Sequence, residues 1–321
     1  MSVSLRTTAR AKVGNWYEDL RLEQDTLREY LEKKERGELA AQKSDFLKEH
    51  ILKPVSLSVS TDGAVHFGDT VMLVNVGGPR RESTALSINA EVSSLSRGES
   101  SPGLQSPCEV SAAPQLQACT RTALIIASVD GSLEGTHLHY EQTFALKSTG
   151  GFARGLFLTS DIRTFQKCAK KSRLQEVSLE ADGSFLSWWK VVHFDPQERL
   201  EHEGLPVPAN AKVLIVHCKT NQALAVLGNQ VLWTMLGKSF EVTAHTFLDS
   251  HKAEEENNHW WICTSDPGQE GLVLFNRPDP SDPATPPSTD QATPPSIDPA
   301  LPPCPAQAPP ICTDPSTAEL R

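Results

Sequence analysis

The sequence has no long apolar run, and this excludes a membrane-spanning helix. Its longest apolar stretches, such as Val213 to Val216, are far shorter than the roughly 20 residues that a bilayer requires. The N-terminal segment MSVSLRTTARAKVGNW is basic but lacks the apolar centre of a secretory signal. We therefore expect a protein of the cytoplasm with no membrane partner.

The chain also has no surplus of basic residues. It contains 30 Lys and Arg residues against 40 Asp and Glu residues, which gives a formal net charge of -10. Binding to the phosphate backbone of a nucleic acid requires a broad basic surface. We therefore expect no nucleic acid among the partners.

Paired metal-binding and disulfide motifs are missing as well. The seven cysteines are odd in number and include no CxxC pair, which favours free thiols in a reducing compartment. Histidines gather in the C-terminal half, and His217, His245 and His251 are the candidate cluster for a metal enzyme. They show neither HExxH nor CxxC…HxxxH spacing, and His217 and Cys218 are adjacent and point to opposite faces of a strand. We predict no metal site and no cofactor.

Nucleophile motifs are equally scarce. The Gly-rich segment at residues 150–155 is not followed by the Lys-Ser/Thr pair of a phosphate-binding loop. No GxSxG sequence surrounds Cys168, Cys218 or Cys263, so a Cys-His pair stays open only as an alternative. The sequence predicts no catalytic residues and a protein that is not an enzyme.

The first 53 residues are typical of a helical arm. Leu20, Leu27, Tyr30 and Leu31 recur at helical spacing within residues 18–36, and Gly37 provides a stop. A second helix is expected over residues 45–52, ending before Pro54. An indole outside the folded core is suited to anchoring on another surface, although docking on its own domain is equally open. The candidate partner contacts are Trp16, Glu18, Asp19, Leu27 and Leu31.

After Pro54 the pattern changes to short strands. Residues 55–67 predict a hairpin with a turn at Asp62-Gly63, and Val71 to Val74 predict a buried strand. Residues from about 80 to 119 are rich in Ser, Gly, Pro and Glu, with a short apolar patch at Leu86 and Ile88, and predict a surface insertion. Further short strands are expected at residues 124–126, 144–146, 156–158, 177–179, 188–192, 213–216, 223–227, 231–233 and 242–245.

A weak internal repeat narrows the fold. Similar runs at residues 69–74, 142–146 and 211–216 each open a unit of roughly 70 residues. Many short strands in three units predict a mostly β chain whose core, residues 54–275, is a β-trefoil. Residues 276–321 are Pro-rich and lack the apolar content to fold, so they are predicted to be a disordered tail.

A β-trefoil also raises a lectin hypothesis, in which aromatic residues stack on sugar rings. The QxW motif of ricin-type repeats is not matched, because Gln230-Val231-Leu232-Trp233 has the wrong spacing. The five tryptophans of the core are better explained as core or interface residues. They are Trp188, Trp189, Trp233, Trp260 and Trp261.

Several ordered motifs carry a resemblance to a known family. They include Gly14-Asn15-Trp16 with Glu18-Asp19, Phe67-Gly68-Asp69, Thr149-Gly150-Gly151-Phe152, Pro206-Val207-Pro208-Ala209-Asn210 and Leu248-Asp249-Ser250-His251. From about Val13 to Trp260 the chain resembles the cilia- and flagella-associated protein 161 family. The Ser-rich segment and the Pro-rich tail are not part of the resemblance.

The resemblance implies a structural role. The family implies an MIR-like β-trefoil and a microtubule inner protein in the lumen of the A-tubule of axonemal doublets, in motile cilia and sperm flagella. The implied partners are α/β-tubulin and neighbouring microtubule inner proteins, and the implied effect is support of doublet stability and of beating. The alternative is an MIR-type β-trefoil that binds carbohydrate or peptide without catalysis.

Overall fold

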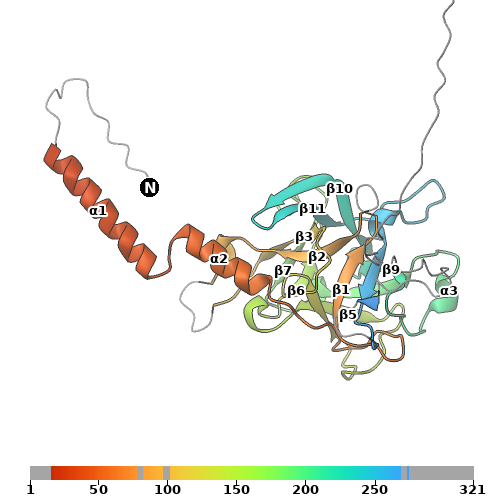
Figure 1. Cartoon of the computed structure of the whole chain (residues 1–321). Coiled ribbons are helices and arrows are strands. Elements are labelled where there is room, and N and C mark those ends of the chain that lie inside the picture. The colour runs from red at the N-terminus through yellow and green to blue at the C-terminus, as the bar shows by residue number, and fades with distance from the viewer. Residues whose placement is uncertain (1–15, 78–81, 97–101, 269–272, 275–321) are drawn as a thin grey trace, which may run out of the picture. The chain divides into compact units, whose positions relative to one another are not determined.

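A twelve-stranded sheet dominates the structure, a computed structural model that describes residues 16–77, 82–96, 102–268 and 273–274 (Figure 1). The helices are α1 (Trp16–Glu35), α2 (Ala40–Ile51) and the short α3 (Arg199–His202). The strands are β1 (Thr70–Asn75), β2 (Thr84–Asn89), β3 (Cys108–Ala113), β4 (Ala123–Ser128), β5 (Thr143–Ser148), β6 (Phe157–Ser160), β7 (Gln175–Glu180), β8 (Trp189–His193), β9 (Lys212–His217), β10 (Gln222–Thr234), β11 (Gly237–Ala244) and β12 (Trp260–Cys263).

The strands form a closed barrel and a cap. β1, β4, β5, β8, β9 and β12 pair in that order, all antiparallel, and β12 pairs back with β1. The other strands form the hairpins β2–β3, β6–β7 and β10–β11, and β3, β7 and β11 also pair with one another. Each run of four consecutive strands therefore forms one of three equivalent units. This topology confirms the predicted β-trefoil and its opening strands β1, β5 and β9.

The turn before each opening strand repeats the same backbone conformation. Gly68, Glu141 and Asn210 have φ values of 90°, 66° and 61° and stand two residues before β1, β5 and β9. Positive φ is easy for glycine and tolerated by asparagine, but costly for most other residues. The three units thus share this positive-φ turn, although only the first unit has a glycine at the position.

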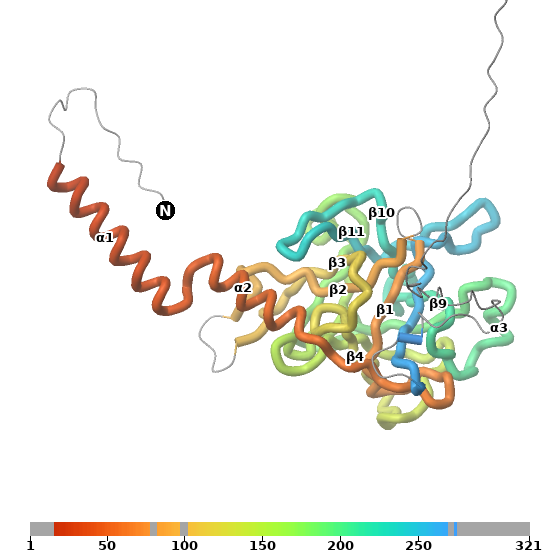
Figure 2. The backbone as a smooth tube through the Cα atoms, viewed as in Figure 1, coloured from red at the N-terminus to blue at the C-terminus, as the bar shows by residue number. Residues whose placement is uncertain are grey.

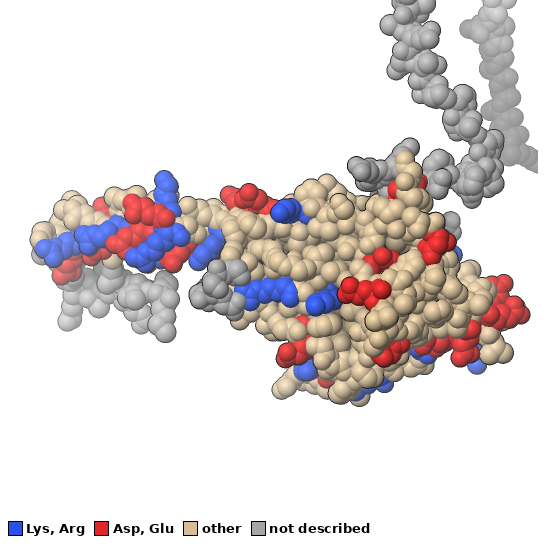
Figure 3. Space-filling view, turned by 90° about the horizontal axis from the view of Figure 1, so that it is seen from below, with Lys and Arg blue, Asp and Glu red and all other residues tan. Residues whose placement is uncertain are grey.

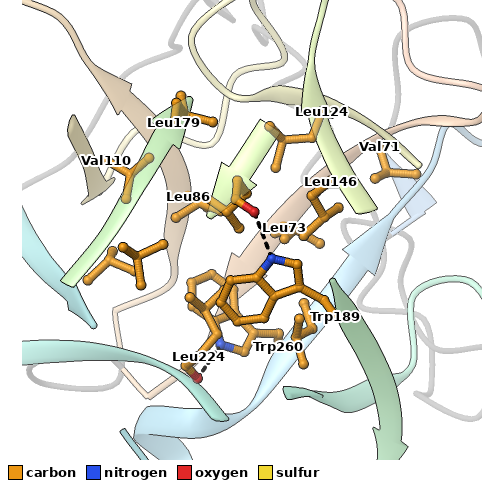
Figure 4. Close-up of a cluster of buried hydrophobic side chains, with 14 of the residues drawn as sticks. Val71, Leu73, Leu86, Val110, Leu124, Leu146, Leu179, Trp189, Leu224 and Trp260 are labelled. Carbon is orange, nitrogen blue, oxygen red and sulfur yellow. Dashed lines mark hydrogen bonds between the residues drawn. The ribbon is translucent and has the colours of Figure 1, made fainter. Parts of the chain in front are cut away.

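Two tryptophans fasten the barrel to the cap (Figure 4). Trp189 begins β8 and Trp260 begins β12, and both side chains are fully buried. The indole of Trp189 donates to the Leu158 carbonyl at 2.8 Å, and that of Trp260 donates to the Leu224 carbonyl at 2.9 Å. In the second and third units the first residue of the fourth strand thereby holds the second strand, while its rings fill the core.

The first unit makes a similar connection with an arginine. Arg121, which is buried just before β4, donates from Nε to the Ile88 carbonyl in β2 at 3.1 Å. Its Nη2 also donates to the Ser239 hydroxyl in β11 at 3.3 Å. Different side chains serve the same link, and this explains why the internal repeat is weak in the sequence.

The predicted arm of residues 1–53 divides into two parts. Leu47 and Ile51 of α2 are fully buried in the main core, and the ring of Phe46 lies 6.1 Å from that of Phe152. Figure 2 shows how the chain leaves α2 and enters the trefoil. No residue of α1 is buried. α2 therefore docks on its own domain, which is one of the two alternatives that the sequence left open for the helical arm.

The predicted surface insertion at residues 80–119 is wrong where the structure describes it. β2 and β3 lie there, and every residue of β2 is buried. Small residues misled the prediction, because Ala and Ser make up much of both strands. The hydroxyl groups of their serines find partners inside the sheet, as when Ser87 donates to the Ser111 carbonyl at 2.9 Å.

The predicted hairpin at residues 55–67 is also not formed. Val59 bridges Ser265, Ala64 bridges Pro208 and His66 bridges His137, so this segment pairs with distant parts of the chain. Strand β12 was not predicted, and the predicted disordered tail, residues 276–321, lies outside the described residues.

Replacing a buried indole should cost far more than replacing an exposed one. We expect Trp260→Ala to lower the free energy of unfolding by about 3–5 kcal/mol, because it leaves a cavity and removes the indole hydrogen bond to the Leu224 carbonyl. Trp233→Ala, at a side chain that is 80% exposed, should change it by less than about 0.5 kcal/mol. Urea unfolding of both variants checks this, and equal losses would contradict the assigned core.

Candidate interaction surfaces

The exposed apolar side chains of α1 form a stripe. Trp16, Leu20, Leu27 and Leu31 are separated by four, seven and four residues, which places them on one side of the helix. Trp16 is 84% exposed and Leu27 is 58% exposed. We call these four residues the α1 stripe. Leu22, also exposed, lies on the opposite side of the helix.

Charged side chains stabilise α1 only weakly. Glu18 and Asp19 lie in its first turn and Lys33 in its last, where each complements the helix dipole. Acidic and basic side chains alternate along the helix (Figure 3), and Lys33 forms an ion pair with Glu29. Exposed pairs of this kind contribute about 0.3–0.5 kcal/mol each. Packing of the stripe on a surface is therefore the main stabilisation left for α1, since most helical stability in proteins comes from the packing of an apolar face.

Glu18 and Asp19, two of the predicted partner contacts, have a role within the helix as its first-turn acids. Trp16, Leu27 and Leu31 keep their status as predicted contacts, because their exposed side chains have no such internal role. Among the described residues, no helix combines the length and the apolar character needed to cross a bilayer.

The loop between β6 and β7 forms a second exposed surface that the sequence analysis missed. We call residues 161–173 the basic loop. Phe165 at its centre is 97% exposed. The backbone amides of Lys171 and Ser172 donate to the two carboxylate oxygens of Glu241 at 2.8 and 2.9 Å, which fixes the loop on β11. Its basic residues, all exposed, are Arg163, Lys167, Lys170, Lys171 and Arg173.

The basic loop left two signals in the sequence. Five basic residues stand within eleven positions of an acidic chain, and an aromatic residue lies among them. An exposed aromatic side chain surrounded by cations is typical of a protein contact. Some of the charge is used internally, because Lys170 pairs with Glu109 and Lys167 lies 3.8 Å from Asp161.

The tryptophans separate into core and surface residues. Trp189 and Trp260 are core residues, as the sequence indicated, whereas Trp233 near the end of the β10–β11 hairpin is exposed. Trp188 is partly exposed. Rings that are buried in the barrel are out of reach of a sugar.

The candidate cluster of the metal-enzyme alternative, His217, His245 and His251, is not formed in the described residues. His217 is fully buried, and its Nδ1 and Nε2 lie 2.9 Å from the Thr220 hydroxyl and 3.0 Å from the Leu186 carbonyl, so both ring nitrogens are occupied. The groups of potential ligands in the described residues do not contain His217, His245 or His251.

The structure instead brings together two sets of side chains that the sequence analysis did not single out. One contains Asp62, His66 and His137, and the other contains His193, Glu198 and His202. In each set the potential ligand atoms lie within 4.8 Å of one another. Their spacing along the chain matches no metal motif, because loops rather than a helix carry most of them.

Two of the candidate cysteine nucleophiles, Cys218 and Cys263, lie in unsuitable surroundings. Burial raises the pKa of Cys263 to about 12. Burial also raises the pKa of Cys218. A reactive cysteine requires a lowered pKa, because the thiolate is the nucleophile. His217 cannot act as a base for either thiol while Thr220 and Leu186 hold its ring.

Comparison with known proteins identifies the family of this chain. A family model, the cilia- and flagella-associated protein 161-like domain, matches residues 43–265. The chain belongs to the cilia- and flagella-associated protein 161 family. The family member from Danio rerio is 57% identical over 272 residues, covering 83% of this chain and 90% of that protein. The family member from Bos taurus is 41% identical over 277 residues, covering 84% and 86%.

The family's domain begins within α2 and ends just after β12, so it contains the whole trefoil. The protein is thus one of the cilia- and flagella-associated proteins. Among solved structures, the SDF2-like protein of Arabidopsis thaliana is similar with a TM-score of 0.44 and 16% identity, covering 62% of this chain and 94% of that one. A Caenorhabditis elegans protein of unknown function has a TM-score of 0.47 and 16% identity, covering 66% and 99%.

The buried histidine at position 217 should make stability depend on pH. Desolvation by burial lowers the pKa of His217 in the folded protein, whereas unfolded histidine titrates near 6.5. The unfolded chain therefore binds more protons below about pH 6.5, and stability falls as the pH falls through that value. We expect His217→Gln to reduce the slope of unfolding free energy against pH, by up to about 1.4 kcal/mol per unit.

Urea unfolding at several pH values between neutral and mildly acidic measures this slope. The matched control is His251→Gln at an exposed position, which should keep the wild-type slope. His245 and His259 have pKa values lowered by burial too, so a residual slope is expected in both variants. An unchanged slope in His217→Gln would show that His217 is not a neutral buried group.

Proposed function

We propose that this protein is a structural microtubule inner protein in the lumen of the A-tubule of axonemal doublets. The observation that carries the proposal is the α1 stripe, an unburied apolar face on a charged helix in a member of a cilia- and flagella-associated family. Its partners are α/β-tubulin and neighbouring microtubule inner proteins. Its effect is to support doublet stability and the beating of motile cilia and sperm flagella.

Two surfaces of different chemistry support this role. The α1 stripe offers apolar anchors, with an indole at the start of the helix. The basic loop offers Phe165 within a group of cations and is suited to an acidic protein surface. Joining two modest contacts in one chain raises the overall affinity through effective concentration. A luminal protein of this kind needs several such contacts and no deep pocket.

The surroundings of two candidate catalytic residues favour a protein without catalysis. His217 is held between Thr220 and Leu186, and burial keeps the Cys263 thiol protonated at neutral pH. The trefoil then serves as a rigid body that presents its loops.

Fractionation of axonemes tests the proposal directly. Tagged protein in multiciliated cells should stay with doublet microtubules through increasing salt and leave them only when the tubule wall opens. Release with the soluble matrix would contradict an inner protein and favour a β-trefoil that binds carbohydrate or peptide.

Charge introduced into the α1 stripe should detach the protein. We expect the double variant Leu27→Glu/Leu31→Glu to bind doublets at least about tenfold less, because each change should cost at least about 1 kcal/mol at an apolar contact. The measurement is the fraction of protein retained on salt-washed doublets from cells that express the variant.

The matched control is Leu22→Glu, which places the same charge on the opposite side of the same helix. It should be retained like the wild type. Equal loss in both variants would point to a damaged helix, which circular dichroism of the purified proteins would detect. Full retention of the double variant would show that the α1 stripe contacts no partner.

A further inference from the structure

Two loops from different units meet at the end of the barrel opposite the cap. The amide of Leu138, in the loop before β5, donates to the Val65 carbonyl, in the loop before β1, at 2.8 Å. The same pairing makes a β-bridge between His66 and His137. The two imidazole rings consequently lie side by side, with centroids 4.7 Å apart and planes inclined by 37°.

A carboxylate joins the two imidazoles. Asp62 Oδ2 lies 3.0 Å from His66 Nε2 and 2.8 Å from His137 Nε2. Its other oxygen, Oδ1, accepts from the Ala64 amide at 3.1 Å, which fixes the side chain with Oδ2 toward the rings.

We infer that Asp62, His66 and His137 bind one divalent transition-metal ion, with zinc as the best fit. All three ligand atoms lie within 4.8 Å of one another. In a tetrahedral zinc site with nitrogen and oxygen ligands, neighbouring ligand atoms are about 3.3 Å apart. Shifts of a few tenths of an ångström would bring Oδ2 and each Nε2 to that spacing. Two imidazoles and one carboxylate favour zinc over calcium or magnesium, which prefer oxygen ligands.

A second carboxylate prepares His66 for metal binding. Asp69 Oδ2 lies 3.4 Å from His66 Nδ1 and accepts the His66 backbone amide at 2.8 Å. A proton held on Nδ1 toward this carboxylate leaves the lone pair of Nε2 free for the metal. Carboxylate–histidine pairs of this kind orient the ring and strengthen it as a ligand. The ligand side chains are 20–45% exposed, so water can reach the ion and complete its coordination.

Among the described residues at this end of the barrel, only the bridge between the first and second units has this chemistry. The corresponding bridges are Ala64 with Pro208 and His139 with Pro206, and neither contains two histidines. One ion per trefoil is therefore expected. Bound there, the ion would tie the first unit to the second across the backbone pairing.

The second set of side chains differs in geometry. The rings of His193 and His202 are stacked, with centroids 4.0 Å apart and planes inclined by only 9°. Lone pairs in nearly parallel ring planes do not converge on one ion. His202 Nδ1 is already 2.9 Å from the Glu198 carbonyl. This set provides the control for the first.

Titration of the full chain, freed of any polyhistidine tag, with cobalt tests the site. We expect one equivalent of Co²⁺ to bind with the visible absorption of tetrahedral coordination, and Zn²⁺ to displace it. Asp69→Asn should weaken zinc about 10- to 100-fold, and His137→Gln should weaken it more. His202→Gln and His251→Gln should bind as the wild type does.

Thermal unfolding with and without zinc gives an independent readout, since an ion that binds only the folded state raises the melting temperature. The rise should be present in the wild type and His202→Gln and lost in His137→Gln, whose metal-free melting shows whether it folds. Failure of the wild type to bind would overturn the inference and leave Asp62 as a hydrogen-bonded bridge. Unchanged binding by His137→Gln, or cobalt absorption typical of thiolate ligands, would overturn it too.

Discussion

A ring of three backbone hydrogen bonds holds together the end of the barrel opposite the cap, and the rest of the trefoil depends on these bonds. Val65 donates to Val207 at 2.9 Å, Val207 donates to Leu138 at 2.8 Å, and Leu138 donates to Val65 at 2.8 Å. All three residues are fully buried, so a missing partner would leave an unsatisfied amide and carbonyl at a cost of about 1–3 kcal/mol. Each unit supplies one donor and one acceptor to its two neighbours. No unit can close this end alone, and the three therefore form one cooperative body.

The same ring explains which parts of the fold could be predicted. The opening strands β1, β5 and β9 have strong apolar runs, and their periodicity revealed three units. The segment around Val65 alternates like a hairpin strand, yet its partners are Leu138 and Val207, more than 70 residues away in sequence. Hydrophobic alternation within a short segment does not reveal which distant segment it pairs with. Strands β2 and β3 were not predicted for another reason. Ala and Ser make up five of their twelve residues, and their burial comes from the neighbouring strands.

The candidate sites also differ in whether spacing along the sequence or contacts between distant segments bring their residues together. The α1 stripe was predictable, since a helix places Leu27 beside Leu31 through spacing alone. Asp62 and His137 gave no signal, because only the ring of backbone bonds brings their loops together. The sequence was misleading for His217, which was grouped with His245 and His251 as the candidate metal cluster. Its ring is instead part of the barrel's internal hydrogen bonding.

Threefold repetition of the backbone leaves the side chains of each unit free to differ. Tryptophan links barrel to cap in the second and third units, whereas Arg121 does so in the first. The basic loop belongs to the second unit alone, and the third unit places prolines where the first and second have His66 and His137. A scaffold held by main-chain bonds tolerates these exchanges, because the bonds do not depend on side-chain identity. Contacts on one face of a repetitive body can therefore become specific for a partner without any change in the fold.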